Sequence, residues 1–307
     1  MKLISHNFFL KIITFLWSIF PLNSTRDLLL FLAQKIAINN FIYIFSSKFG
    51  PKISLTFPSD ISWLKYSLER NYEKSSIKFI NKFSKDINGV FFDVGSNIGW
   101  FSVHMLYFNN KNIVHSFEPQ NLICKKLAKN IEINGFENRS IINQFGLSSN
   151  DNKKINIYNM PKDPHGHAFL ENKDGAEIIE SIELKTLDNY VISNIVENIK
   201  FIKIDVEGHE LDVLLGAKSI IKFHEPIIMF EAKSSTGKIS KSFQEIYKLI
   251  NSLNKNYVLY KVPDYKGQIT KVISFEINDK LDDVLINYTN LLFVPKKYLN
   301  NIHRWIY

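Results

Sequence analysis

From residue 89 onward, short apolar runs alternate with stretches of helical periodicity. Three of the runs, Val90–Val94, Ile113–Phe117 and Phe201–Ile204, are rich in β-branched and aromatic residues, which is typical of strands covered on both faces. In the segments that follow them, apolar residues recur every three or four positions, as on one face of a helix. The alternation predicts an α/β fold with a mostly parallel sheet and helices on its faces.

The alternation lapses in the middle of the chain. Residues 154–158 and 182–187 predict two short strands, and the polar segment between them, residues 159–181, is longer than most loops of compact domains. Loops of that length are usually functional or disordered, so we expect specificity for the bound molecule to depend on it. Near the carboxyl end, residues 257–262 and 291–294 predict an antiparallel hairpin at the edge of the sheet.

The first fifty residues differ from the rest because two apolar-rich stretches, 8–22 and 26–49, dominate them. The uninterrupted part of the first stretch is too short for a bilayer span, which takes about 20 apolar residues. No small-residue cleavage site follows it, which argues against a secretory signal. Two interpretations remain: helices that pack on the main domain or on a second copy of the chain, or an interfacial membrane anchor.

The length and composition of the chain allow one large domain with an accessory segment. We predict a helical accessory segment with its lead-in at residues 1–88 and the main domain at residues 89–307. The net charge is +8, but Lys and Arg are dispersed. A solvated surface explains this charge, as does weak attraction to anionic lipids, glycans or nucleic acid. The one cysteine, Cys124, excludes an internal disulfide and every cysteine-rich zinc site, and favours a cytoplasmic location.

Acidic residues end four of the predicted strands, namely Asp93, Glu118, Asp205 and Glu231. A single acid at a strand end is explained by helix capping or by a turn. Four of them on one parallel sheet face the same edge, where open α/β sheets bind their ligands. Glu118 follows Asp93 by 25 residues, close to the spacing at which an acid binds ribose hydroxyls in nucleotide-binding βαβ units. We therefore expect a ligand that contains a nucleoside.

The turn after the first strand narrows the choice of nucleoside. Its pattern is Asp93-x-Gly95-x-Asn97-x-Gly99, in which two glycines allow a sharp turn and a close approach of the backbone. It lacks the three glycines of a dinucleotide-binding turn, and no strand is followed by a Gly-Lys-Ser/Thr phosphate loop. An acid beside the turn would repel a pyrophosphate, but it suits the cationic amino-acid tail of S-adenosylmethionine.

Four segments in this order resemble the FkbM-type family of S-adenosylmethionine-dependent methyltransferases. They are Phe92–Gly99, Ser116–Pro119, Thr186–Asp188 and Phe201–Glu210, and the resemblance covers residues 89–235. It implies a Rossmann-like, seven-stranded methyltransferase sheet and O-methylation of a sugar or another natural-product hydroxyl. It also implies which residues bind the cofactor: Asp93, Gly95, Asn97 and Gly99 along the methionine part, Glu118 at the ribose, and Gly146 and Leu147 along the adenine.

Methyl transfer to a hydroxyl requires in-line positioning and benefits from a general base. Asp205 is our first candidate for the polar group beside the reacting centre. Glu207 either orients the substrate or begins the turn, and His209 is either the base or a helix-start residue. Glu231 either binds substrate or caps a helix. In the long loop, His165 and His167 either close over the site, as base or lid, or are bystanders.

Three further points stay open at this stage. A divalent metal is compatible with the carboxylates and histidines, but no dedicated ligand spacing assigns one. The expected partner is a carbohydrate or glycolipid acceptor rather than a nucleic acid, with peripheral membrane contact or self-association through residues 1–50. The alternatives to the enzyme are a non-catalytic binding module on the same fold and an RNA methyltransferase.

Overall fold

The computed structural model describes residues 41–46, 50–57, 59–60, 73–159, 175–231, 243–263, 269–271 and 288–306, with the single residues 28, 31 and 63. The chain divides into two units, residues 1–72 and residues 73–307, and each is considered by itself. Helix α4 (Lys74–Asp86), predicted as part of the lead-in, belongs to the second unit. The predicted division at residue 88 stays a prediction.

In the first unit, two strands pair antiparallel, β1 (Phe41–Ser46) and β2 (Lys52–Phe57). Residues 41–46 lie inside the stretch 26–49, which was predicted as part of the helical accessory segment, so the helical prediction is wrong for these six residues. The physical reason is their run of aromatic and β-branched side chains, which favours a strand once a partner strand is present. Among the helices that the structure describes, none combines the length and the apolar character that crossing a membrane requires.

The second unit is built on a mixed sheet whose described strands run in the order β12-β11-β13-β10-β9-β3-β4-β5. The five strands from β10 to β5 are parallel, while β13 pairs antiparallel with both β10 and β11. The predicted α/β class and the antiparallel pair at the carboxyl end are therefore confirmed. The strand bounds are β3 Val90–Val94, β4 Ile113–Phe117, β5 Ser140–Asn143, β9 Ile199–Ile204, β10 Ile227–Glu231, β11 Tyr257–Pro263, β12 Thr270–Lys271 and β13 Tyr288–Pro295.

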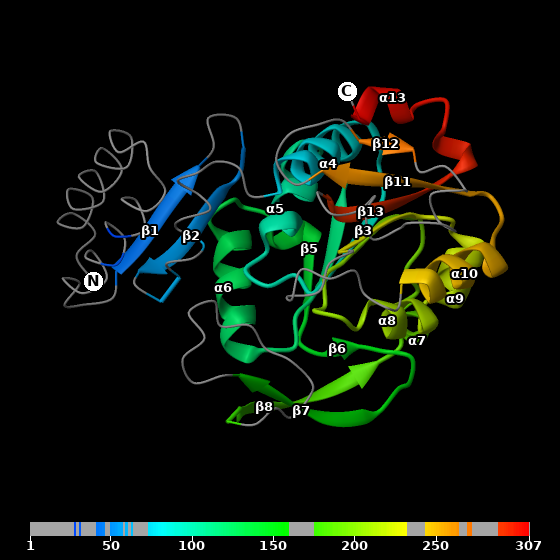
Figure 1. Ribbon diagram of the computed structural model, residues 1–307. Helices are drawn as coiled ribbons and strands as arrows, with labels where there is room; N and C mark the ends of the chain where they lie inside the picture. Colours follow the sequence, from blue (N-terminus) through cyan, green and yellow to red (C-terminus); the bar gives the residue numbers. More distant parts are fainter. Residues whose placement is uncertain are drawn as a thin grey trace. The chain divides into compact units, whose positions relative to one another are not determined.

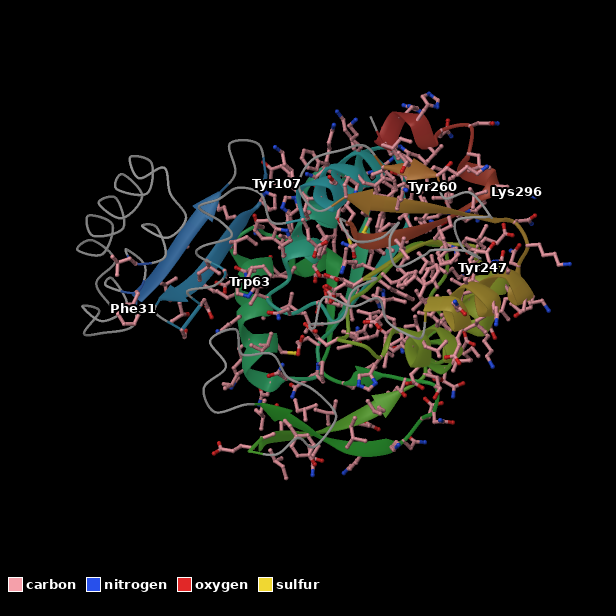
Figure 2. All side chains as sticks on the ribbon, in the orientation of Figure 1. Phe31, Trp63, Tyr107, Tyr247, Tyr260 and Lys296 are labelled. Carbon is pink, nitrogen blue, oxygen red and sulfur yellow. The ribbon has the colours of Figure 1, made fainter. Side chains whose placement is uncertain are left out.

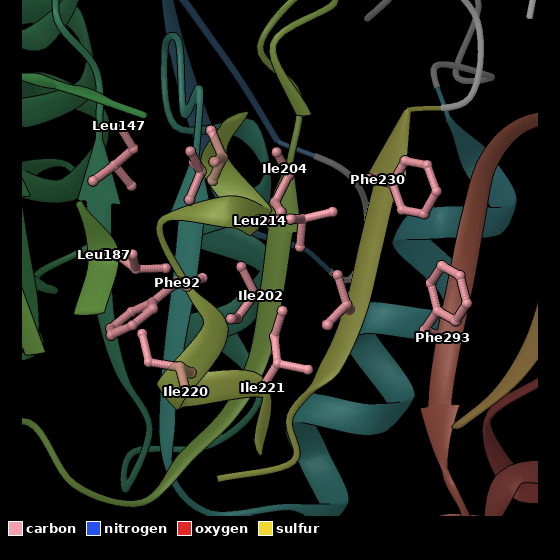
Figure 3. Close-up of a cluster of buried hydrophobic side chains, with 14 of the residues drawn as sticks. Phe92, Leu147, Leu187, Ile202, Ile204, Leu214, Ile220, Ile221, Phe230 and Phe293 are labelled. Carbon is pink, nitrogen blue, oxygen red and sulfur yellow. The ribbon is translucent and has the colours of Figure 1, made fainter. Parts of the chain in front are cut away.

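Helices cover both faces of this sheet (Figure 1). On one face the described helices α7, α8, α9 and α10 pack over the strands, and their apolar side chains form the larger core (Figure 3). On the other face lie α4, α5 and α13. The helix bounds are α5 Trp100–Tyr107, α6 Asn121–Glu132, α7 Leu187–Ser193, α8 Glu210–Leu215, α9 Lys218–Phe223, α10 Phe243–Leu253 and α13 Ile302–Ile306.

The alternation of side chains along β9 shows why both faces need a cover. Ile202 and Ile204 belong to the larger core. Phe201 points the other way, and its ring lies 5.6 Å from the ring of Phe83 in α4. Toward the edge of the sheet, the ring of Tyr247, labelled on α10 in Figure 2, lies 6.3 Å from that of Phe293. A strand buried on both faces, such as β9, is apolar at nearly every position, so a charged residue within it is exceptional.

A second sheet has the order β6-β8-β7, with β6 at Gly146–Leu147, β7 at Lys153–Asn159 and β8 at Glu177–Lys185. Strands β7 and β8 pair antiparallel, so both strands predicted in the middle of the chain are present. Their bounds differ from the prediction, because residues 177–181, predicted as loop, belong to β8, and Leu187 begins α7. Residues 160–174, the greater part of the predicted long loop, lie outside the described residues.

Candidate active site

The register of the parallel strands places three of the four predicted acids in one row. Val94 of β3 is level with Phe117 of β4 and with Ile204 of β9, and Phe230 of β10 is level with Ile204. The residues that follow them therefore form a row along the carboxyl edge of the sheet. The row reads Glu118, Gly95, Asp205 and Glu231, and Asn290 of β13 continues it.

This row lies at the point where the chain reverses its direction across the sheet. From β3 the chain proceeds outward through β4 to β5, and it later returns to β9 on the other side of β3. Open α/β sheets bind ligands outside the carboxyl ends of the strands at such a switch point. Three of the four acids predicted from the sequence, Glu118, Asp205 and Glu231, thus lie along one edge of the sheet, and their binding of a ligand stays a prediction.

The glycine turn joins β3 to α5 in a left-handed backbone conformation. Gly95 has φ +73°, and a Cβ atom there would lie 1.8 Å from the backbone oxygen of Asp205. Gly99 has φ +84°, and a Cβ there would lie 2.3 Å from Leu127. Both glycines are thus required by the neighbouring protein atoms, in addition to any close approach of a ligand.

The side chain of Glu118 binds the backbone of the glycine turn. Its Oε2 accepts a hydrogen bond of 3.0 Å from the backbone N–H of Asn97, and its Oε1 accepts one of 3.0 Å from the N–H of Gln120. Burial raises the pKa of Glu118 to about 7, although these two donors act in the opposite direction. Each oxygen retains a further lone pair, so the carboxylate can still accept hydrogen bonds from vicinal hydroxyls. Its binding to a ribose stays a prediction.

Asp93 lies deeper than the row, with a side chain only 1% exposed. Its Oδ2 accepts a hydrogen bond of 2.5 Å from the hydroxyl of Ser102 in α5. The Ser102 oxygen lies 2.8 Å from that of Ser116, which must be the donor because Ser102 has a single hydroxyl proton. Burial raises the pKa of Asp93 to about 6. The structure thus assigns Asp93 a protein partner that the sequence did not indicate.

Lys203 is the residue that sequence reasoning missed at this site. Its side chain is 0% exposed, and its Nζ lies 3.0 Å from Oδ2 of Asp205. Burial lowers the pKa of Lys203, but the carboxylates of Asp205, Glu73 and Asp93 outweigh this effect and raise it overall. A lysine between two isoleucines of a buried strand is the signal that could have revealed it.

The pKa of Glu231 also depends on its surroundings. Burial raises the pKa of Glu231 to about 10, and the negative charge and the hydrogen-bonding contact of Asp205 act in the same direction. At neutral pH this carboxyl is therefore protonated and can donate a hydrogen bond. The structure brings Glu231 to Asp205, as predicted, while its binding to substrate stays a prediction.

The turn after β9 carries the other two catalytic candidates. Glu207 is exposed and has φ +51°. His209 precedes α8, and its Nδ1 lies 3.9 Å from a carboxylate oxygen of Asp212. Sequence reasoning overlooked Glu210, whose Oε1 accepts hydrogen bonds from the N–H groups of Gly208, at 3.0 Å, and Val206, at 3.4 Å. The catalytic roles of Glu207 and His209 stay predictions.

The remaining candidates are the two residues expected at the adenine and the two histidines of the long loop. Gly146 pairs with Leu184 in the second sheet, and Leu147 packs in the larger core, which accounts for its burial without a ligand. Their contact with adenine stays a prediction. His165 and His167 lie outside the described residues.

The donor set fits S-adenosylmethionine better than it fits a metal. The row offers carboxylates for ribose hydroxyls and for a cationic group, and the buried Ser96 hydroxyl in the turn has no hydrogen-bond partner among the described atoms. Within the described ranges, no group of three or more His, Cys, Asp and Glu residues is placed to hold a metal ion.

Comparison with known families yields one match. The family described as "Methyltransferase FkbM domain" matches residues 93–259, which is more than half of the 307 residues. The matched range includes the glycine turn and the strands that carry the acidic row. No curated protein sequence matches the chain.

Several solved structures are similar to the chain at low sequence identity. The FkbM methyltransferase of Methylobacillus flagellatus KT is 19% identical, with a TM-score of 0.44, over 67% of this chain and 43% of that one. For a SAM-dependent methyltransferase from Agrobacterium tumefaciens the identity is 9% and the TM-score 0.45, over 85% and 72% of the two chains. For an rRNA methylase from Streptococcus thermophilus the values are 12% and 0.38, over 70% and 93%. The chain spans less than half the length of the first of these proteins.

Proposed function

The chain belongs to the FkbM family of methyltransferases, and from this premise we propose that it is an S-adenosylmethionine-dependent O-methyltransferase whose acceptor is a hydroxyl of a sugar, a glycoconjugate or a similar natural product. The observation that carries the proposal is the row of Glu118, Gly95, Asp205 and Glu231 along one edge of the sheet. The row has a carboxylate at one end for a ribose and two adjacent carboxyls at the other end for a second molecule.

At the cofactor end of the row, the residues of the turn would bind and orient S-adenosylmethionine. Glu118 would accept hydrogen bonds from the ribose hydroxyls, and the hydroxyl of Ser96 would find its partner in the ligand. When bound, S-adenosylmethionine supplies a methyl group on a positively charged sulfur. The negative charge of Asp93 and Asp205 on either side of the turn suits that cationic ligand.

At the acceptor end, Asp205 would take the proton of the attacking hydroxyl while the methyl group moves in line from sulfur to oxygen. Glu231, whose carboxyl proton is directed at Asp205, would accept a hydrogen bond from a second hydroxyl of the acceptor through its other oxygen. Two adjacent carboxyls that offer oxygens to hydroxyl groups suit a polyhydroxylated acceptor. As part of the proposal, a carbohydrate or glycolipid is the acceptor, the 159–181 segment selects it, and residues 1–50 bring the enzyme to a membrane or to a second copy in the cytoplasm.

Calorimetric titration with S-adenosylmethionine and with S-adenosylhomocysteine tests the cofactor site. We expect micromolar binding of both, weakened about 100-fold in Glu118→Ala because two charge-assisted hydrogen bonds to the ribose are lost. Glu132→Ala, an exposed acid of α6, is the matched control and should bind like the wild type. Absence of heat with either compound would refute the proposal.

Transfer of a radiolabelled methyl group tests the acceptor. Purified protein is incubated with tritiated S-adenosylmethionine and with separate polysaccharide, lipid and RNA extracts. We expect label in the polysaccharide or lipid fraction. Label in RNA would favour the RNA methyltransferase instead, and cofactor binding without transfer to any fraction would favour the non-catalytic binding module.

A further inference from the structure

Lys203 lies in a cluster of carboxyls that come from separate elements. Its position in β9 is level with Asp93 in β3, and its ammonium lies 3.0 Å from the carboxylate of Asp205. The ring of Phe101 in α5 lies on another side of the ammonium, with its centroid 4.5 Å from Nζ. An ammonium held between a carboxylate and an aromatic ring, and sealed from water, has little freedom to move.

Glu73 and the residues that bind it form a second group that interacts with Lys203. Glu73, directly before α4, favours the charged form of Lys203. Glu73 is itself fixed by Asn290, whose Nδ2 donates hydrogen bonds to Glu73, at 2.5 Å, and to the Ser76 hydroxyl, at 3.0 Å. The carboxyls that interact electrostatically with the Lys203–Asp205 pair are Glu73 before α4, Asp93 of β3, Glu210 of α8 and Glu231 of β10.

We propose that Lys203 is a positioning residue for acceptor deprotonation: its ammonium binds Oδ2 of Asp205 and thereby leaves Oδ1 as the oxygen that takes the acceptor proton. This inference rests on the proposed function. In the step, the acceptor O–H bond breaks toward Oδ1, a bond forms between the acceptor oxygen and the methyl carbon, and the sulfur–carbon bond breaks with its electron pair left on sulfur. The products are a methyl ether, the neutral thioether and protonated Asp205.

The chemistry of the cluster explains why a lysine is needed there. Burial favours the protonated form of Glu73, Asp93 and Glu231, the other carboxyls that interact with the Lys203 ammonium. Asp205 is the carboxylate in direct contact with the Lys203 ammonium, while burial favours the protonated form of Glu231 beside it. The same contact fixes the direction of the carboxylate, so that it does not rotate away from the acceptor.

The kinetic test compares Lys203→Met and Lys203→Gln with the wild type. Tritiated S-adenosylmethionine and a mixture of methyl hexosides serve as probes, and the transfer rate is measured from pH 5 to pH 9. We expect kcat to fall about 100-fold in the Met variant, with cofactor affinity within about threefold of the wild type. The acid limb of the pH–rate profile should move to higher pH, because the carboxylate loses the positive charge beside it. Loss of a purely structural residue would lower the yield of folded protein and would leave this limb in place.

Two comparisons keep the test decisive. In an Asp205→Asn background, Lys203→Met should reduce the rate no further, since its effect acts through Asp205. Lys222→Met, an exposed lysine of α9, should behave like the wild type. If Lys203→Met fails to fold, Lys203→Gln retains a donor for Oδ2 and is used in its place. An unmoved acid limb, or an equal loss of rate in the Asp205→Asn background, would overturn the proposal.

A measurement without an acceptor separates the two proposals. Carbon-13 NMR of the Asp205 carboxyl, identified by its disappearance in Asp205→Asn, is followed against pH in the wild type and in Lys203→Gln. We expect the carboxyl to titrate at higher pH in the variant, and identical titrations would refute the role of Lys203. Failure of the wild type to label any hexoside would count against the proposed sugar acceptor, whereas the NMR titration would still decide on Lys203.

Discussion

The backbone N–H of Asn97 donates a hydrogen bond of 3.0 Å to Oε2 of Glu118. This bond joins the turn after the first strand of the domain to the end of the neighbouring strand. The bond holds Asn97 in its left-handed conformation, with φ +47°, and it also holds the buried carboxylate of Glu118 in place. The two parts of the expected cofactor site are therefore one structural unit, and changes to either should be felt by the other.

Glu118→Gln should change how stability depends on pH. The folded pKa of Glu118, about 7, lies above its ordinary value of 4.5, so its stabilising contribution is full below pH 4.5 and is lost as pH rises through 7. The wild type should thus gain stability relative to the variant between pH 8 and pH 5, on the order of 2 kcal/mol. Urea unfolding of both proteins at the two pH values measures this.

Comparing the wild type with Glu118→Gln removes the contribution of other titrating groups to the stability, because both proteins contain them. Burial lowers the pKa of His104 to about 3 and that of His115 to about 4, and these histidines destabilise the fold as the pH falls. Both are present in the wild type and in the variant. A stability difference that does not vary between pH 8 and pH 5 would contradict the assignment to Glu118.

Gly95→Ala should be far more damaging than a glycine substitution elsewhere. The new Cβ would collide with the backbone oxygen of Asp205, and the backbone would be held at φ +73°. We expect a loss of about 4 kcal/mol or no folded protein. Gly135→Ala is the matched control because its φ is +70° and the space around it is open, so it should cost only about 1 kcal/mol. Chemical denaturation followed by circular dichroism compares them, and equal losses would show that the close approach of Asp205 is unimportant.

Ser102→Ala should destabilise the protein more at high pH than at low pH. The variant leaves the buried Asp93 carboxylate without its hydroxyl donor, which costs about 1–3 kcal/mol when Asp93 is charged. Since the pKa of Asp93 is about 6, the cost should be nearly complete at pH 8 and much smaller at pH 5. Thermal unfolding at both pH values provides the measurement. Ser252→Ala, an exposed serine of α10, should show no such pH dependence.

Glu210→Ala should loosen the turn that carries Glu207 and His209. Its side chain accepts the N–H groups of Gly208 and Val206, and the turn contains two residues with positive φ. We expect a loss of about 1–2 kcal/mol and faster amide exchange at Gly208, because the acceptor of that N–H is removed. Hydrogen exchange by NMR reports on it directly. Exchange at Gly208 that matches the exposed control Glu197→Ala would argue that other contacts hold the turn.

The sequence alone determined the class of fold and the edge of the sheet at which the acids gather. Apolar runs with β-branched residues are local signals, and acids such as Glu118 and Asp205 at the ends of such runs must meet, since the carboxyl ends of parallel strands share one edge. The glycines of the turn were also readable, although their main neighbours proved to be protein atoms. The sequence prediction failed in β1, where residues 41–46 had been assigned to a helical segment but pair with a partner strand.

Only the tertiary structure decided the surroundings of those acids. Asn290 binds Glu73 across 217 positions of the chain, and the hydroxyl that binds Asp93 comes from a helix on one face of the sheet. Sequence reasoning missed Lys203 although it is a charge in an apolar strand and its partner Asp205 lies only two positions further along, whereas its contact with Phe101 of α5 arises only in the folded chain. Contacts between distant segments leave no periodic trace in the sequence, because they arise only when the packed core brings the segments together.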